Sequence, residues 1–468
     1  MAQQLYFSRD SQMFLEIGTS VWKIPVLEGF SFSQATNTSE VTLAEMESTA
    51  GVSKRGRRAF NDSLAPVDFS FSTYIRPFKS AGVDNGAGGS ADDDLEVHAV
   101  EEALWALFSG PAAYVTGTDL FTNQITPGTT VSTLLFTASN TATLGPDAGA
   151  NLYFELGDAS KICYKLAKVA INEASIDFDI DGVAQINWSG FADTITDITK
   201  TVTVNGTISN DVLEIDGSVG FSAPYTGTDG ADSADFDRRV HGTGVLADSY
   251  IDGVTDTDTA SFNATQSVAD DAILTLLGPR ATVYEGITQT NNFIRNRLTK
   301  CLVNTEADPQ SALENTYVLT LTGGTITLSN NITYLTPEEL GTVNIPIGHV
   351  TGARAFGGSF TCYLTEDDTN SNSSRDFFGD LTSTAQRSEV TNDFKLTFAI
   401  GGGTVSGNAI SDSDLADTAL MIEFPRCHID IPTHAIDDIV TLETTFMALP
   451  ESIETADEMV MVYKGPAA

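Results

Sequence analysis

The chain has 468 residues, of which 41% are hydrophobic and only 19% are charged, so it is long enough for two or three domains with sizeable cores. Its formal net charge is −39, from 63 acidic and 24 basic residues. Such a negative field opposes tight wrapping of nucleic acid and adhesion to an anionic membrane, although DNA could slide past it without sticking. The same acidity would also keep an abundant protein in solution.

The four cysteines, Cys163, Cys301, Cys362 and Cys427, lie far apart and form no CxxC pair. This spacing fits neither a disulfide scaffold nor a zinc site, so we expect buried free thiols. The first residues show no basic stretch followed by an apolar one, and we expect no signal peptide. No run of roughly 18 apolar residues predicts a membrane span.

The first part of the chain is dominated by strand patterns. Residues 13–17 and 21–24 are predicted strands, and residues 29–33 and 67–75 alternate between apolar and polar side chains. Between them, the polar segment 39–66 is predicted to be a very long loop. A run of three aspartates then begins a predicted helix over 94–108, because negative charge is favourable at a helix N-terminus. Further strands are predicted between residues 151 and 189.

Residues 193–271 differ from the rest in composition. They contain fifteen acidic and three basic residues, separated by small and turn-forming residues. This composition is compatible with a linker, a large surface insertion or a small extra β domain.

The first pattern then returns. Residues 71–75 (FSTYI) resemble residues 360–364 (FTCYL), and residues 174–178 resemble residues 427–431. A predicted helix over 375–384 mirrors the first one, and a loop at 336–355 mirrors the segment 39–66. We interpret this as an internal duplication. The predicted fold is mainly β, with two tandem β-sandwich or barrel domains at 1–195 and 290–468, each with a short flanking helix, and an acidic insertion at 196–289.

The sequence contains no GxGxxG before a predicted helix, no GxxxxGK[ST], no HExxH and no GxSxG motif. His428 and His434 flank Asp430, but no third clear ligand adjoins them, and a structural role is favoured over metal binding. Asp256 and Asp258 do not have EF-hand spacing. We therefore predict no enzyme activity, cofactor or metal. Two alternatives stay open: an acidic β-rich adhesin or capsid decoration protein, and a β-rich glycan hydrolase, which would need a pair of carboxylates in a cleft.

One basic cluster stands out in this acidic chain: Lys54, Arg55, Arg57 and Arg58. No aromatic residues are interleaved with it, which argues against binding of single-stranded nucleic acid. We interpret it as the tip of a loop that meets the acidic surface of a neighbouring subunit. A solvated loop without contacts is the alternative.

Several blocks taken together resemble one family. They are residues 54–64, 69–75, 171–174, 183–190, 322–326, 330–337, 345–348 and 448–450. In this order, and across both halves, they resemble the tail tube protein of T-five-like siphophages. The resemblance implies a fused pair of tube domains, with three chains in each pseudo-hexameric ring and the inner sheets joined around a channel.

The resemblance also assigns roles to residues. Loops that reach the next ring would include Lys54, Arg55, Arg57, Arg58, Asn61 and Asp62 in the first half, and Glu338, Glu339, His349 and Arg354 in the second. Acids that face the channel, and so repel DNA phosphates, are expected among Asp177, Asp179, Asp181 and Asp430. The long acidic region departs from the family pattern, and no immunoglobulin-like domain is expected at the C-terminus.

Partners implied by the resemblance are further copies of the chain, a tape measure protein, a tail terminator and distal tail proteins. Viral DNA would pass through the channel without specific binding. The protein would be assembled in the host cytoplasm, become part of the virion and need no membrane.

Overall fold

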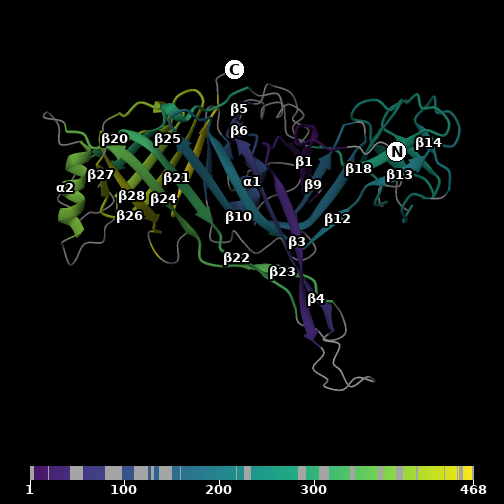
Figure 1. Cartoon of the computed structure of the whole chain (residues 1–468). Coiled ribbons are helices and arrows are strands. Elements are labelled where there is room, and N and C mark those ends of the chain that lie inside the picture. Colours follow the sequence, from purple (N-terminus) through teal and green to yellow (C-terminus); the bar gives the residue numbers. More distant parts are fainter. Residues whose placement is uncertain are drawn as a thin grey trace, which may run out of the picture.

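The computed structural model describes most of the chain: residues 5–18, 20–42, 56–79, 97–109, 125–127, 131–135, 150–158, 160–217, 219–225, 233–282, 291–304, 316–337, 343–366, 373–385, 394–406, 409–436, 438–450, 452 and 457–465. The described part is mainly β, as predicted, with two α-helices (Figure 1). Every ladder between its named strands is antiparallel.

The two halves repeat one order of strand pairing. In the first half, the order is β2 (Ser20–Ile24), β1 (Gln12–Ile17), β9 (Ala150–Leu156), β10 (Ile162–Asp179), β11 (Gln185–Ala192), β4 (Arg57–Tyr74) and β3 (Ser31–Thr42). In the second, it is β20 (Thr316–Leu319), β19 (Lys300–Asn304), β25 (Phe394–Ile400), β26 (Ala419–Ile429), β28 (Val440–Ala448), β24 (Ala355–Tyr363) and β21 (Leu321–Ser329). The same path in both halves is the structural mark of a duplication.

The two repeats share one sheet. The second half of β10 pairs with β21, from Glu173 opposite Ser329 to Asp179 opposite Gly323. This pairing, called the seam below, gives the strand order β3-β4-β11-β10-β21-β24-β28-β27, where β27 is Thr433–Ile436. Among the described residues, the strand pairings never return to a strand already used, so this part of the sheet is open.

Each repeat has a helix at the same place along the chain, between β4 and β9 in the first repeat and between β24 and β25 in the second. Helix α1 (Glu102–Ser109) packs on β10, and α2 (Ser374–Ala385) lies beside β20. The prediction for the second helix was nearly correct. The first begins later than predicted, because β6 (Val97–Ala99) pairs with β5 (Pro77–Lys79). The Glu102 carboxylate accepts a hydrogen bond from the Ala99 amide (3.2 Å) and so ties the first residue of the helix to β6.

A buried polar cluster joins the halves behind the sheet. The Trp105 indole donates a hydrogen bond to the Tyr463 hydroxyl (2.7 Å), and that hydroxyl donates to the Glu101 carboxylate (2.9 Å). Tyr463 belongs to β29 (Val460–Lys464), which pairs with β26 and also with β8 (Val131–Leu135), itself paired with β7 (Ile125–Pro127). Burial raises the pKa of Glu101 to about 7.

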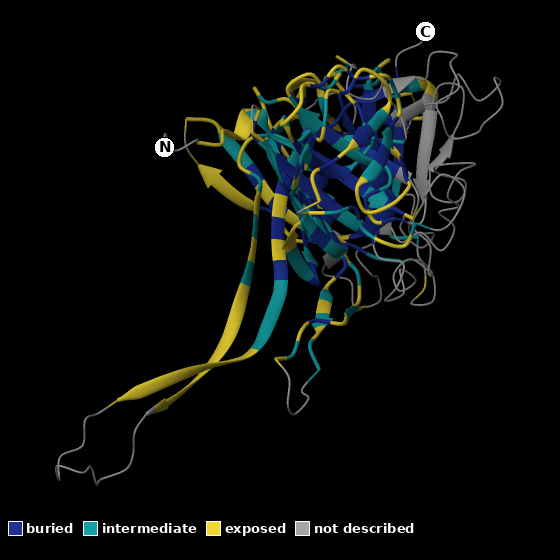
Figure 2. Ribbon diagram, turned by 90° about the vertical axis from the view of Figure 1, so that its right-hand side faces the viewer, coloured by how far each residue is buried: buried dark blue, intermediate teal, exposed yellow. Residues whose placement is uncertain are grey.

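The described part of the segment predicted as a loop, residues 39–42 and 56–66, is almost entirely strand. β3 and β4 continue their pairing to Thr42 and Arg57, with register shifts between Gln34 and Thr36 and between Asn37 and Thr38. This two-stranded arm projects from the body and is exposed along most of its length (Figure 2). A ladder needs only backbone partners, so the hairpin extends beyond the core although its side chains are polar.

The repeats align differently from the sequence comparison. Phe71 lies opposite Trp188, and its counterpart Phe360 lies opposite Thr444. The next residues along β11 and β28, Asn187 and Glu443, face Ser175 and Thr433. Ser175 therefore corresponds to Thr433, and the match of 174–178 with 427–431 was wrong. Pro432, which has no N–H to donate, stands where the second repeat divides this strand into β26 and β27.

The acidic region forms a small β module with its own core. One sheet consists of β13 (Lys200–Thr203), β18 (Ile273–Pro279) and β15 (Arg238–Gly242), and the other of β14 (Val212–Glu214), β17 (Thr259–Phe262) and β16 (Ile251–Val254). Val204, Leu213, Ile251 and Leu274 are among its buried residues. It follows β12 (Thr194–Asp197), which pairs with β10.

A buried ion pair attaches this module to the first repeat. Arg239 pairs with Glu155 of β9, and its guanidinium lies 3.7 Å from the Phe14 ring centre. Phe14, Tyr153 and Leu277 are buried together at the junction. The module is therefore fixed on the face of β1 and β9 that carries Phe14 and Tyr153, called the outer side below, away from the seam.

All four cysteines are free and buried, as expected. None of the described helices is long and apolar enough to cross a membrane.

The buried position of Glu101 predicts a pH-dependent stability. Its pKa of about 7 lies above the ordinary value of 4.5, so folding favours the protonated carboxyl. The stabilisation from this proton is complete below pH 4.5 and is lost as the pH rises through 7, by about 3 kcal/mol. We expect Glu101→Gln to remove this part of the pH dependence, measured by urea unfolding at pH 5 and pH 7.5. Equal pH dependence in both proteins would contradict the assignment.

The attachment of the acidic module predicts a strong effect of one arginine. Arg239→Ala leaves Glu155, which is 2% exposed, without its counter-charge, and should reduce the free energy of unfolding by about 3–5 kcal/mol. Arg280→Ala is the matched control, because its pair with Asp237 is 36% and 29% exposed and should contribute at most about 1 kcal/mol. Adding Glu155→Gln to Arg239→Ala should restore part of the loss. Equal losses in the two single variants would be evidence against this role.

Candidate assembly surfaces

The face of the shared sheet that does not pack on the core is polar across both repeats. Directly opposed residues form continuous rows, such as Tyr74, Gln185, Asp177, Thr325, Ser359 and Thr445. The six strand segments 66–74, 173–179, 185–192, 321–329, 355–363 and 440–448 contain no Lys or Arg. The sheet thus offers hydroxyl and amide groups with scattered carboxylates, and no cation from these segments.

Three of the four predicted channel acids lie on this face. Asp177 accepts hydrogen bonds from Thr325 (2.8 Å) and Asn187 (3.0 Å) and so bridges the seam. Asp179 follows two residues later on the same strand, and Asp430 accepts a hydrogen bond from the Thr445 hydroxyl. Asp181 lies in the turn after β10, 3.9 Å from Arg297, with a side chain 91% exposed.

The arm carries the described part of the first predicted loop cluster. Arg57 pairs with Glu40 across the hairpin (3.2 Å), and Arg58 lies beside it on the same exposed strand. The Asp62 carboxylate accepts a hydrogen bond from Ser39 (3.0 Å), and Asn61 lies opposite Thr38. Lys54 and Arg55 lie outside the described residues. The described outer end of the arm therefore carries two arginines, one of them paired with a glutamate.

The second predicted loop is a hairpin at the same end of the molecule. It consists of β22 (Ile332–Leu335) and β23 (Gly348–Thr351). Asn344 bonds to the arm through two backbone hydrogen bonds, to the Leu64 amide (2.8 Å) and the Asp62 carbonyl (3.2 Å). Sequence patterns could not indicate this contact, because it joins two polar segments far apart in the chain. Five large apolar residues of this region are about half exposed: Leu335, Val343, Ile345, Ile347 and Val350.

Two of the four residues predicted in this loop, His349 and Arg354, make contacts within the chain. The His349 ring lies 5.4 Å from the Tyr334 ring, and burial lowers the His349 pKa. Arg354 makes a two-pronged ion pair with Glu458 (2.9 and 3.0 Å), and both side chains are largely buried. Glu338 and Glu339 lie outside the described residues. Tyr334 also donates a hydrogen bond to the Lys168 carbonyl, which holds the hairpin on the first repeat.

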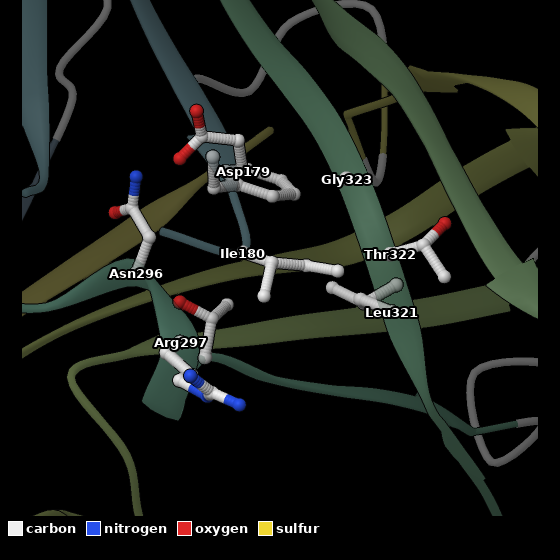
Figure 3. A pocket seen from close by; sticks show the side chains of 9 residues that line it. Asp179, Ile180, Asn296, Arg297, Leu321, Thr322 and Gly323 are labelled. Atoms are coloured by element: carbon white, nitrogen blue, oxygen red, sulfur yellow. The ribbon is translucent and has the colours of Figure 1, made fainter. Parts of the chain in front are cut away.

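A small hollow lies at the end of the seam opposite the arm. It is bounded by the end of β10, the start of β21 and the short helix η4 (Asn296–Leu298), with Asp179 and Asn296 on one side and Leu321 and Thr322 on the other (Figure 3). Its volume of about 140 Å³ is below the roughly 300–1,000 Å³ of ordinary ligand sites. It offers little room for a substrate.

The described residues contain no group of three or more His, Cys, Asp or Glu side chains placed to hold a metal ion. His434 lies against the Phe378 ring (4.7 Å between ring centres), whereas His428 lies 3.6 Å from Asp430. The surfaces with a distinctive chemistry are thus the polar sheet face, the arm and the sheet edges.

Comparison with curated proteins identifies one that is similar in sequence. This chain is 26% identical over 449 residues to "Tail tube protein pb6" of Escherichia phage T5, with 94% of this chain and 70% of the phage protein covered. The chain is a homologue of the T5 tail tube protein. The alignment includes both repeats, because it covers 94% of this chain. No protein-family model matches the chain.

Proposed function

We propose that the chain is the subunit of a phage tail tube, built of stacked rings that each contain three chains. The observation that carries this proposal is the shared sheet, in which two copies of one fold are joined edge to edge. A contact between repeats that exists within a chain can recur between chains until a ring closes. Three chains would contribute six repeats and a pseudo-six-fold ring. Homology to the T5 tail tube protein supports the same reading.

The polar face of the shared sheet is the proposed lining of the channel. DNA phosphates would meet hydroxyls, amides and the carboxylates of Asp177, Asp179 and Asp430 there, with Asp181 at the rim. Lys and Arg would hold phosphates by ion pairing, and the six lining segments contain neither. The genome would therefore pass during ejection without specific binding.

The arm and the adjoining hairpin are the proposed contacts between rings. They project from one end of the subunit, with Arg57 and Arg58 on the arm and half-exposed Ile345 and Ile347 beside it. The opposite end carries Asp179 and Asp181 next to the seam hollow. Head-to-tail stacking would bring these unlike ends together.

In this function the protein is structural, and the proposal requires neither a catalytic residue nor a cofactor. Its partners would be copies of itself, a tape measure protein in the channel, a tail terminator and distal tail proteins. The subunit would assemble in the host cytoplasm and end in the virion tail. The acidic module, attached to the outer side of β1 and β9, would decorate the exterior of the tube.

Electron microscopy tests the proposal directly. We expect the purified protein, imaged in negative stain at increasing concentration, to form rings or hollow tubes with pseudo-six-fold end views and three chains per ring. Tail-tip components should be added if the protein waits for an initiator. Monomers that stay unassembled even with those components would contradict the proposed function.

Charge reversal on the arm separates stacking from ring closure. Arg57→Glu combined with Arg58→Glu would place acidic residues where the arm meets an acidic neighbour, so we expect rings to persist but tubes to become several-fold shorter. Arg9→Glu is the matched control, because its side chain is equally exposed (75%, against 76% for Arg57) but lies outside the arm. Equal tube lengths in both variants would exclude a stacking role for the arm arginines.

A further inference from the structure

The shared sheet leaves one unpaired edge at each side of the subunit. Within the described part of the chain, β3 pairs only with β4, and β27 pairs only with β28. β27 lies beside α2 at one end of the sheet, whereas β3 lies beyond β10 (Figure 1). We propose that β3 of one chain pairs antiparallel with β27 of the next, with Ser33 opposite Thr433 and Ser31 opposite Ala435. This inference rests on the proposed function and specifies its ring contact.

The two edges are counterparts of the two strands that form the seam. In the first repeat, β3 is the last strand of the pairing order and lies beside β4. In the second repeat, β21 is the last strand and lies beside β24, so β3 and β21 are counterparts. The second half of β10 pairs with β11, and β27 pairs with β28, so β27 is the counterpart of that part of β10. The pairing of β10 with β21 is therefore an intrachain copy of a contact between β27 and β3.

The register follows from the ladders. Ser70 and its counterpart Ser359 face Ser31 and Thr325, so Ser31 corresponds to Thr325 and Ser33 to Thr327. Ser175 corresponds to Thr433, as shown by their partners in β11 and β28. At the seam Ser175 lies opposite Thr327. If the free edges pair in the same register as the seam, Thr433 lies opposite Ser33. Two residues further along β27, Ala435 lies opposite Ser31.

Side-chain packing supports this transfer. At the seam, Phe178 is 4% exposed and lies 5.4 Å from Phe398 of the second repeat. Its counterpart at the free edge, Ile436, is 82% exposed. A large apolar residue that is buried in one repeat and bare in the other indicates a missing partner.

The expected partner of Ile436 is present on the other edge. Phe398 corresponds to Phe154, and each has a phenylalanine of the sheet in edge-on contact: Phe360 at 6.3 Å from Phe398 and Phe71 at 6.5 Å from Phe154. Beside the free edge, Phe30 stacks on Phe154 (5.3 Å between ring centres) and Phe32 lies tilted against it (4.9 Å), and both are partly exposed. Ile436 of the neighbouring chain would be buried against this aromatic cluster.

Charge on the two edge strands does not oppose their contact. Residues 30–34 (FSFSQ) and 433–436 (THAI) contain no acidic residue, although the chain carries a net charge of −39. Two such chains repel one another at long range, but here the paired strands add no like charges at contact.

Cysteine cross-linking of assembled tubes tests the register. Directly opposed Cβ atoms lie about 4.5–5.5 Å apart and can form a disulfide, whereas pairs offset by two residues lie about 7–8 Å apart and cannot without movement. The aligned pairs are Ser33→Cys with Thr433→Cys, and Ser31→Cys with Ala435→Cys. The offset controls are Ser31→Cys with Thr433→Cys, and Ser33→Cys with Ala435→Cys. All native cysteines are buried, which keeps the background low.

We expect oxidised tubes of the aligned variants to give a covalent ladder that stops at three chains on a non-reducing gel, at least ten-fold stronger than in the offset controls. Rings that are visible by microscopy but show equal or no cross-linking in the aligned pairs would overturn this inference and leave the proposed function intact. Failure of the wild-type protein to form rings would overturn both.

A second variant tests the apolar contact at the edge. Ile436→Asp should abolish ring formation without changing the melting temperature of the monomer, because the side chain is exposed before assembly. Ile439→Asp is the matched control, since Ile439 is 60% exposed but lies outside β27. Rings formed by Ile436→Asp as readily as by the control would overturn the proposed contact.

Discussion

The pairing of β10 with β21 is the constraint on which the architecture depends. It joins two copies of one fold through backbone hydrogen bonds and so fixes their relative orientation by register, not only by surface packing. Because Asp177 bonds to Thr325 across it, the seam is specified on its polar face as well as in its core. An assembly of such chains needs fewer bimolecular contacts, since every second contact between repeats already exists within a chain.

The two repeats have the same order of strand pairing, but different segments cover their outer surfaces. In the first, the outer surface at Phe14 and Tyr153 is covered by the acidic module through Leu277. In the second, Leu302, Ala399 and Met421 are covered by Ile410 and Leu415, from the connection between β25 and β26. A shared sheet must keep matching edges and register, whereas an outer surface has only to be covered. This difference explains how a duplicated chain can keep one path of pairing and still acquire an insertion of about eighty residues.

The sequence predicted what local patterns encode. Alternation identified the strands around Phe69 and Ile176, because it depends on which face of a strand is buried. The position of α2 was predicted from its correspondence with the first helix. It did not predict the arm, since its strands continue through polar residues without a core. It also misaligned the repeats at Cys427, because Pro432 divides one strand of the second repeat in two. The contact of Asn344 with the arm joins distant segments through backbone atoms and leaves no trace in composition.

A subunit with two open edges must avoid pairing at random before it assembles. β27 is only four residues long, and β3 carries two register shifts that bend it away from a flat template. Both features limit how many hydrogen bonds an incorrect partner can make, and the net charge of −39 opposes indiscriminate association. Correct pairing gains in addition the burial of Ile436 against Phe154, which only one register supplies. Selectivity at these edges therefore depends on side chains, because the backbone alone offers too short a ladder.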